Sequence, residues 1–387
     1  MYFDVNSTTP VRHEVRDAMT RCLRDLGANP STSYRDGRKT REAVERARQQ
    51  VAAAVGADPD EIFFTSGASE ANNTVLHSVA QMRPERRALI TPIEHASVAQ
   101  GARAHLGDRV DELRVDGTGR VPREELLGRV SRDHGCVAMI LGNNEIGTIQ
   151  PPETVRAAAE WCERNRAIFH LDVTQCVGKV PVDLHALGCH TASMSAHKVY
   201  GPKGVGALYI RRDAQGRVEP LISGGSQEAS AGRFVRAGTE NVPGILGMGM
   251  AFELSAAEVA REGPRLRGLR DLLQRELLRA VPGSVVHALG ADRLPNTLSI
   301  SFPRVNSRAF CAALDEAGVA VNVGSACSKQ GRSKVLASIG VSEELERGVV
   351  RISLGKSTGA RECQRLVGLM RDLHGRCGTS ACPRQDP

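Results

Sequence analysis

Hydrophobic and polar positions alternate along the first two thirds of the chain in a way that predicts helices between short apolar strands. From Arg41 to Ala54 the apolar residues recur at helical spacing, and Gly56 supplies the end of that helix. A second helix is expected from Glu153 to Asn165. Strands are expected at the short apolar runs Ile62–Thr65, Leu89–Thr91, Val137–Leu141, Ile168–Leu171, Thr191–Met194 and Gly206–Ile210. This alternation predicts an α/β fold with a mostly parallel sheet covered by helices.

The pattern changes near residue 255. The stretch from Glu253 to Ala280 is rich in Arg, Glu and Leu, which predicts a long helix that links two domains. Strands at Thr297–Phe302 and Val349–Leu354, with a helix at Ser307–Ala317 between them, predict a smaller α+β domain. We therefore expect a large domain of residues 16–255 and a small domain of residues 1–15 and 256–387. The polar tail from Gly375 is expected to fray.

Composition narrows the class of protein. With 387 residues, 41% of them hydrophobic and 25% charged, the chain is typical of a soluble globular protein and unlike a disordered one. No apolar run approaches the roughly 20 residues that span a bilayer, and the first residues lack the features of a secretory signal, so we expect a cytoplasmic protein without a membrane segment. The net charge of +7 is spread along the chain. It indicates a mildly basic surface or a face for an acidic partner, while direct nucleic-acid binding is not expected.

Ten cysteines are scattered without any CxxC pair, so no metal site is expected. Most of them are expected to be reduced, buried, small hydrophobic residues. Cys327 differs, because Gly324 and Ser325 precede it and the polar, basic segment 328–332 follows it. Neighbouring cations lower the pKa of a thiol and raise its thiolate fraction. The alternative for this residue alone is an inert buried cysteine.

Polar residues cluster where the predicted strands end. Ser66–Ser69 follows a strand and opens a helix, and this arrangement suits a phosphate at a helix N-terminus, or else an ordinary tight turn. Asp172 directly follows another strand. Its carboxylate is expected either to face a heterocyclic nitrogen of a ligand or to cap a helix. Ligands of open α/β sheets bind at the carboxyl ends of the strands, so these groups are expected to lie near one another.

Lys198 and His95 complete this set. Lysine is scarce in a chain that uses arginine freely, and Lys198 stands at the end of an apolar strand, before a Gly-Pro-Lys-Gly segment. Lysine forms a Schiff base and arginine does not, although a surface lysine is the simpler interpretation. His95 also follows a strand. It is expected either to stack on the planar ring of a ligand or to have a structural role only. A lysine, an acid and a phosphate-binding turn together specify pyridoxal 5'-phosphate (PLP).

The sequence resembles cysteine desulfurases of the NifS/IscS type, in the class V aminotransferase family of fold-type I PLP-dependent transferases. The motifs run in family order from residue 4 to 355. They are 4–9 (DVNSTT), 65–70 (TSGASE), 94–95 (EH), 143–147 (NNEIG), 170–175 (HLDVTQ), 195–198 (SAHK), 236–241 (RAGTEN), 324–327 (GSAC) and 351–355 (RISLG).

The resemblance implies a role for each matching residue around the cofactor. Lys198 would hold PLP covalently and move protons, Asp172 would pair with the ring nitrogen, and His95 would stack on the ring and relay a proton. Gln175 and Asn144 would bond the phenolic oxygen. The phosphate would be held by Ala68, Ser69, Ser195, His197 and, from the second subunit of a homodimer, Thr239.

The resemblance also implies the substrate side. Arg351, with Asn144, would bind the carboxylate of L-cysteine as a bidentate partner. Cys327 would be the nucleophile that takes the substrate sulfur as a persulfide, releases L-alanine and passes the sulfur to an acceptor protein. The destinations left open are iron–sulfur cluster assembly, tRNA thiolation and DNA phosphorothioation. The alternatives are a selenocysteine lyase, another class V PLP enzyme of the aminotransferase type, or a scaffold that has lost catalysis.

Four positions depart from the family pattern. Ala68-Ser69 replaces Ser/Gly-Thr, and Val173 stands where a small Ala is usual beside the ring. An insertion, Ala229–Ala231, precedes the Thr239 motif, and the segment after Cys327 is shorter than in most relatives. The short segment predicts a less mobile Cys327, which needs either a specialised sulfur acceptor that approaches closely or a rearrangement of the pocket.

Overall fold

The computed structural model describes residues 1–225, 228–230, 233–324 and 332–377. Within these ranges, seven strands form the large sheet, in the order β1 (Ile62–Thr65), β7 (Gly206–Ile210), β6 (Thr191–Ser195), β5 (Ile168–Asp172), β4 (His134–Ile140), β2 (Arg87–Ile90) and β3 (Val110–Glu112). The strands from β6 to β3 are mutually parallel, so the expected mostly parallel sheet is confirmed. Strand β7 runs antiparallel to β6 and to β1 because the connection from β6 is too short for a crossover helix.

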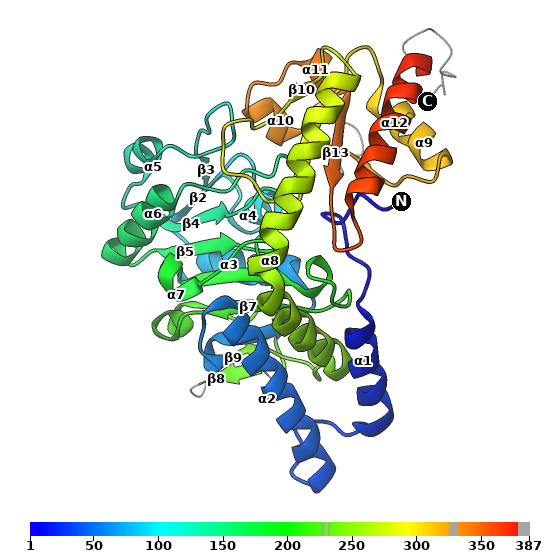
Figure 1. Ribbon diagram of the computed structural model, residues 1–387. Helices are drawn as coiled ribbons and strands as arrows, with labels where there is room; N and C mark the ends of the chain where they lie inside the picture. The colour runs from blue at the N-terminus through cyan, green and yellow to red at the C-terminus, as the bar shows by residue number, and fades with distance from the viewer. Residues whose placement is uncertain (226–227, 231–232, 325–331, 378–387) are drawn as a thin grey trace.

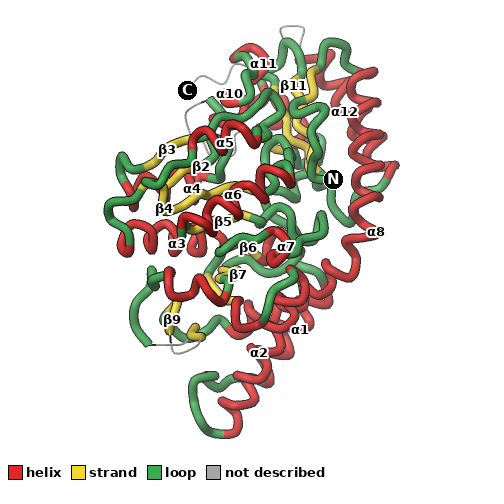
Figure 2. The backbone as a smooth tube through the Cα atoms, turned by 90° about the vertical axis from the view of Figure 1, so that its left-hand side faces the viewer, coloured by secondary structure: helices red, strands yellow, loops and turns green. Residues whose placement is uncertain are grey.

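Helices cover both faces of this sheet (Figure 2). Alternate residues of β4 point to opposite faces, with Val137 and Met139 in one hydrophobic cluster and Cys136 and Ala138 in another. The first cluster includes side chains of α2, α6 and α8, and the second those of α3 and α4. Strands buried on both faces read as continuous apolar runs, which is why the sequence identified them.

The helix bounds follow the predicted pattern with shifted ends. The described helices before the middle of the chain are α1 (His13–Asp25), α2 (Arg35–Val55), α3 (Ala68–Met82), α4 (Ala96–Leu106), α5 (Arg123–Arg129), α6 (Pro152–Asn165) and α7 (Leu184–Leu187). The later ones are α8 (Val242–Ala280), α9 (Ser307–Glu316), α10 (Lys334–Ser338), α11 (Glu343–Arg347) and α12 (Ala360–Cys377). Short 3-10 turns lie at η1 (Pro59–Glu61), η2 (Ala196–Lys198) and η3 (Arg212–Arg217). As expected, α2 ends at Gly56, which has a left-handed backbone.

A small antiparallel sheet has its own core at the other end of the molecule (Figure 1). Its order is β10 (Val285–Val286), β11 (Thr297–Ser301), β13 (Val349–Ser353) and β12 (Asn322–Val323). Phe3 packs in this core, and Asp4 bridges to Ser353 on β13. The N-terminal segment thus lies beside the last strand of the small sheet. The division of the chain into domains at residues 15 and 255 stays a prediction.

Helix α8 runs past both sheets and begins earlier than expected. The Asn241 side chain caps it by accepting from the Gly244 amide, so the helix starts at Val242 and not at Glu253. Among the described residues, α8 alone is long and apolar enough to cross a membrane by length and composition, which corrects the expectation that no segment is. Its apolar first half, including Met248 and Phe252, is buried in the large core, and packing accounts for that composition.

The remaining elements lie in the segment before α8 and at the C-terminus. Strands β8 (Glu228–Ser230) and β9 (Arg233–Arg236) form a hairpin that contains the start of the predicted insertion. Helix α12 extends through Gly375 to Cys377, so the tail does not fray from Gly375 as expected. The rest of the tail lies outside the described residues.

Candidate active site

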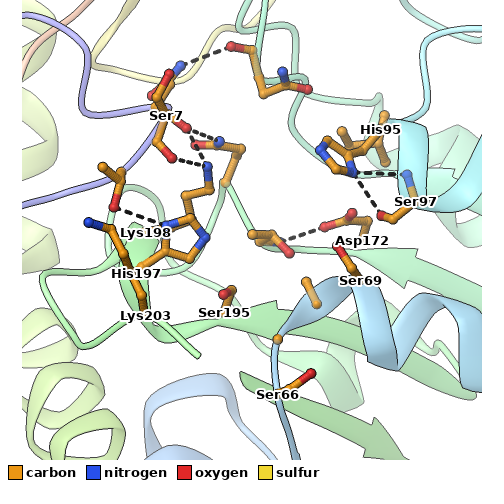
Figure 3. A pocket seen from close by; sticks show the side chains of 18 of the residues that line it. Ser7, Ser66, Ser69, His95, Ser97, Asp172, Ser195, His197, Lys198 and Lys203 are labelled. Carbon is orange, nitrogen blue, oxygen red and sulfur yellow. Dashed lines mark hydrogen bonds between the residues drawn. The ribbon is translucent and has the colours of Figure 1, made fainter. Parts of the chain in front are cut away.

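A cavity of about 650 Å³ opens where β4, β5 and β6 end and α3 begins (Figure 3). This is the edge of the sheet at which the sequence predicted a ligand. The predicted site residues that line it are Ala68, Ser69, His95, Asn144, Asp172, Gln175, Ser195, His197, Lys198 and Arg351. Thr239 is exposed and is not among the lining residues, and Cys327 lies outside the described residues.

The N-terminus of α3 forms one wall of the cavity. Gly67 is the N-cap, and no described side chain caps the first turn, so the amides of Ala68 and Ser69 are left for a ligand. Ser195, His197 and Lys203 approach from the end of β6 and the turn beyond it (Figure 3). Burial, with Lys198 and Lys203 nearby, lowers the pKa of His197 to about 4, so its ring is neutral at pH 7. Helix dipole, hydroxyl and ammonium groups together suit a phosphate.

Gly206 allows this wall to form. A Cβ atom at this position would lie 2.6 Å from the Gly67 Cα and 2.5 Å from the Met194 carbonyl oxygen. Both contacts are to backbone, which cannot rotate away. Only glycine therefore lets β7 lie between β6 and the turn that starts α3.

Asp172 stands at the end of β5 and is 4% exposed. Its Oδ1 accepts from the Thr174 amide at 3.0 Å within a turn, so Asp172 does not cap a helix as in the simpler interpretation. Its Oδ2 accepts from Nδ2 of Asn72 at 3.3 Å. Asn72 lies on α3 and also bonds His170, so the carboxylate is held from two elements while it lines the cavity. Sequence reasoning missed Asn72, because a polar residue in the middle of a helix forms no motif.

His95 caps α4 and projects into the cavity across from Lys198 (Figure 3). Its Nδ1 accepts from the Ser97 amide at 3.1 Å. The hydrogen of the neutral ring is therefore on Nε2. Burial lowers the pKa of His95, so this neutral form prevails near pH 7. A neutral, fixed imidazole fits both ring stacking and proton relay, and its role stays a prediction.

Lys198 ends the turn η2 and reaches the N-terminal segment of the chain. Its Nζ donates to the carbonyl oxygens of Asn6 at 2.6 Å and Ser7 at 2.7 Å. The Asn6 oxygen also accepts from Nε2 of Gln175 at 3.0 Å. The resemblance included the segment 4–9 without assigning it a role, and in the structure Asn6, Ser7 and Thr8 line the cavity.

Arg351 is 2% exposed and enters the cavity from the middle of β13. Its Nη2 donates to Oδ1 of Asp4 and to Oγ of Ser7, each at 2.7 Å. Its Nη1 donates to the main-chain oxygen of Asn144 at 3.2 Å. Asp4, which the sequence analysis gave no role, thus fixes the guanidinium that is expected to bind the substrate carboxylate.

These donors fit PLP. The uncapped first turn of α3 suits its phosphate, the buried Asp172 carboxylate its ring nitrogen, and Lys198 its aldehyde. When bound, PLP supplies an electron sink that stabilises negative charge at the substrate Cα.

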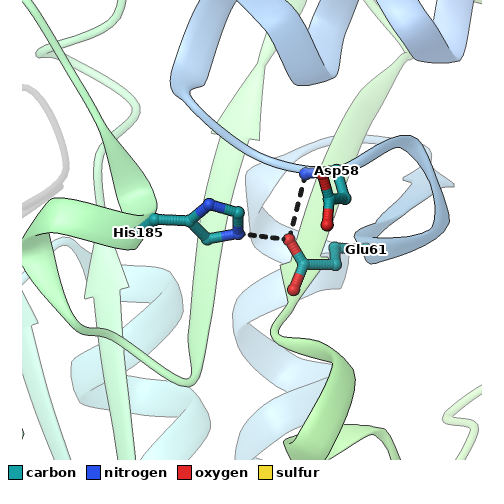
Figure 4. Close-up of side chains that lie close together, drawn as sticks. All are labelled: Asp58, Glu61 and His185. Atoms are coloured by element: carbon teal, nitrogen blue, oxygen red, sulfur yellow. Dashed lines mark hydrogen bonds and ion pairs between the residues drawn. The ribbon is translucent and has the colours of Figure 1, made fainter.

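Asp58, Glu61 and His185 form a second group of possible ligands outside the cavity (Figure 4). Glu61 accepts from Nε2 of His185 at 2.7 Å and from the Asp58 amide at 3.0 Å. Arg212 donates to Asp58 at 3.1 Å and supplies the counter-charge. Local contacts thus account for this cluster, and nothing further points to a metal.

Comparisons with known proteins show the family to which this chain belongs. The model of the family described as "Aminotransferase class-V" matches residues 1–366. The chain is similar to "Cysteine desulfurase IscS" of Dictyoglomus turgidum, with 41% identity over 364 residues, 92% of this chain and 90% of the relative. A solved structure titled "NIFS-LIKE PROTEIN" superposes with a TM-score of 0.88 at 35% identity and covers 97% of this chain and 99% of its own. DndA from Streptomyces lividans gives a TM-score of 0.74 at 32% identity, over 91% and 99% of the two chains.

Proposed function

We propose that this chain, which belongs to the class V aminotransferase family and is a PLP-dependent cysteine desulfurase, moves the sulfur of L-cysteine onto Cys327 and then to an acceptor protein. One observation supports the proposal most strongly. Lys198, His95, Asp172 and Arg351 come from separate parts of the chain and line the same cavity. That cavity holds a proton-transfer group, a planar-ring partner, an acid and a carboxylate-binding group together.

Each residue of the cavity has a role that follows from its position. Arg351, already oriented by Asp4, binds the carboxylate of L-cysteine and aims its Cα at Lys198. Lys198 then accepts the Cα proton at Nζ and returns it later, as a general base and acid. The Asp172 carboxylate would pair with the ring nitrogen of the bound cofactor, and His95 would stack on the ring, with its Nε2–H available for a proton relay.

The sulfur step involves Cys327. Its thiolate attacks the sulfur of the bound substrate, so that an S–S bond forms and the C–S bond of the substrate breaks. The electron pair of the C–S bond stays on the carbon fragment, which takes up a proton and leaves as L-alanine. No external oxidant is required. Lys329 and Arg332 follow Cys327 closely in the sequence and would favour its thiolate.

The test is release of L-alanine and sulfide from L-cysteine with a thiol present. Wild type is expected to release both, and Cys327→Ala neither, with its cofactor still bound. Cys311→Ala is the matched control, a half-buried thiol that is expected to leave the activity unchanged. Equal sulfide release by wild type and Cys327→Ala would favour the alternative, a lyase-type elimination such as that of a selenocysteine lyase.

A homodimer belongs to the proposal, because Thr239 is exposed and absent from the cavity of its own chain. We expect it to bind the phosphate in the partner's cavity. Two variants that each lower activity, Lys198→Ala and Thr239→Ala, test this. Mixed dimers contain one cavity with both residues intact, so mixing is expected to restore activity. If mixing restores nothing beyond the sum of the two variants, Thr239 does not act in the second subunit.

The destination of the sulfur remains a choice among iron–sulfur assembly, tRNA thiolation and DNA phosphorothioation. The insertion at Ala229–Ala231 and the short segment after Cys327 suit a specialised acceptor, and the net charge of +7 is compatible with a DNA-modification pathway, so DNA phosphorothioation is the assignment to test. Deletion of the gene, followed by measurement of DNA phosphorothioates, thiolated tRNA and iron–sulfur enzyme activity, separates the three. Loss of thiolated tRNA or of iron–sulfur enzyme activity, with DNA sulfur unchanged, would refute the phosphorothioation assignment.

A further inference from the structure

A buried lysine lies directly behind the cavity and has no part in the mechanism above. Lys179 is 7% exposed and follows Gln175 in the turn after β5. Its Nζ donates to Oε1 of Gln175 at 2.7 Å and to the main-chain oxygen of the same residue at 3.1 Å. Among the described residues, no carboxylate forms an ion pair with Lys179. Gln175 therefore accepts two hydrogen bonds from this lysine, one through its side chain and one through its main chain.

This contact decides which way the Gln175 amide faces. An ammonium group only donates, so the amide oxygen must face Lys179. The Asn6 carbonyl only accepts, and it lies 3.0 Å from Nε2 of Gln175. Both neighbours select the same orientation, in which one hydrogen of Nε2 is bound to Asn6 and the second is free to point into the cavity that Gln175 lines.

We propose that Lys179 is a positioning residue that holds Gln175 with its NH2 group toward the phenolic oxygen of the bound cofactor. This rests on the proposed role of Gln175. Without Lys179, only the Asn6 carbonyl still selects this orientation, so the amide presents its oxygen to the phenolic oxygen more often, and two acceptors then face each other. A charged donor on Oε1 also polarises the amide and makes Nε2–H a stronger donor.

The surroundings of Lys179 make this charge sensitive to change. Burial, followed by repulsion from Lys198 and Arg351, lowers the pKa of Lys179 to about 7, while the Cys176 thiol acts in the opposite direction. Glu262 and Lys356 line a second, small cavity together with Lys179. Among the described residues, the two oxygens of Gln175 are the acceptors of the Lys179 Nζ.

The effect is visible in the spectrum of the lysine-bound cofactor, whose absorption band changes when its imine nitrogen loses a proton. The proton on the imine nitrogen partly neutralises the negative charge of the phenolic oxygen. A hydrogen-bond donor to that oxygen stabilises its charge after the proton has left, and it therefore favours the form with a deprotonated imine. Lys179→Met is expected to raise the pH midpoint of the spectral change by roughly one unit, as for the loss of one good hydrogen bond. Lys179→Arg retains charge and donors and is expected to shift it less. Lys39→Met, on the exposed surface, is the control.

A double-mutant cycle separates positioning from a simple charge effect. If Lys179 acts through Gln175, Lys179→Met is expected to shift the midpoint in the wild type and little in a Gln175→Leu background. Equal shifts in both backgrounds would overturn the proposal, as would a midpoint in Lys179→Met equal to that of Lys39→Met. Cofactor affinity, measured by titrating each apoenzyme with PLP, is expected to fall in Lys179→Met and Gln175→Leu alike. A wild type that binds PLP but fails to desulfurate L-cysteine would refute the proposed function and leave this test intact.

Discussion

The guanidinium of Arg351 is held by the carboxylate of Asp4, with Nη2 donating to Oδ1 at 2.7 Å across 347 positions of the chain. Oδ2 of the same carboxylate accepts from Nδ2 of Asn322 at 2.9 Å. Asn322 lies beside Arg351 in the pairing of β12 with β13. The N-terminal segment therefore sets the direction of the arginine that is expected to bind the substrate carboxylate.

Asp4→Asn keeps the size of this side chain and removes its charge. We expect kcat/KM for L-cysteine to fall about tenfold to a hundredfold, mainly through KM, because small losses of orientation at a carboxylate clamp are costly. The bound cofactor is expected to keep its spectrum, since Asp4 does not line the cofactor cavity. Asp25→Asn, at an exposed ion pair, is the control. An unchanged KM in Asp4→Asn would show that Arg351 needs no such partner.

Gly206→Ala tests the backbone packing behind the phosphate end. The added methyl group would meet Gly67 and the Met194 carbonyl, so the turn before α3 must move. PLP affinity is expected to fall at least tenfold, measured by titrating the apoenzyme, because the amides of the first turn no longer point at the phosphate. Gly204→Ala is unsuitable as a control because its φ is positive, whereas Gly268→Ala adds a methyl group in open space on α8. Equal PLP affinities in the Gly206 and Gly268 variants would contradict this account.

Much of the large sheet could be predicted, because strands buried on both faces are short apolar runs. Lys198, Asp172 and the turn at Ser66–Ser69 could be predicted for a related reason. Their chemistry is unusual for the end of an apolar strand, and parallel strands bring such ends together.

What the sequence did not reveal depends on contacts between distant residues. Asn6 bonds Lys198 across 192 positions, and Asn72 bonds Asp172 across 100, and neither pairing leaves a local pattern. The reversed direction of β7 was missed because apolar composition does not encode strand direction. The first half of α8 was missed because its apolar residues surround the helix and obscure the helical period.

Glu94 gives a prediction about stability and pH. It is 8% exposed, and its Oε1 accepts from Thr91 and from the Ile140 amide, while no partner of Oε2 is found in the described part of the chain. Burial raises the pKa of Glu94 to about 8 from an ordinary 4.5. Between these values the native protein holds a proton that the unfolded chain has lost. The free energy of unfolding therefore falls as the pH rises through this window.

Glu94→Gln removes this titration and keeps the shape. The Tm of the variant minus that of the wild type is expected to increase from pH 5 to pH 8. The corresponding change in the difference between their free energies of unfolding is a few kcal/mol at most. Thermal denaturation across this range, with exposed Glu85→Gln as control, provides the measurement. Parallel curves for wild type and Glu94→Gln would mean that Glu94 is already ionised in the native protein.

Glu228 connects the β8–β9 hairpin to the large sheet through a buried charge pair. It is 2% exposed and accepts from Nη1 of Arg48 at 2.8 Å and from the Phe64 amide at 3.0 Å. Although burial opposes the charge, the Glu228 carboxylate raises the pKa of Arg48 above its ordinary value. The hairpin leads toward Thr239, so this pair anchors the segment expected to reach the partner's cavity.

Glu228→Ala leaves the buried Arg48 guanidinium without its main partner. We therefore expect the free energy of unfolding to fall by about 3–5 kcal/mol. Arg48 also provides the control, because Glu45 bonds the same guanidinium from a side chain that is 51% exposed. Glu45→Ala is expected to cost less than about 1 kcal/mol, since water screens that pair. Urea denaturation of the two variants measures both. Similar losses in both would show that burial does not set the strength of this pair, and the hairpin would then have to be anchored by other contacts.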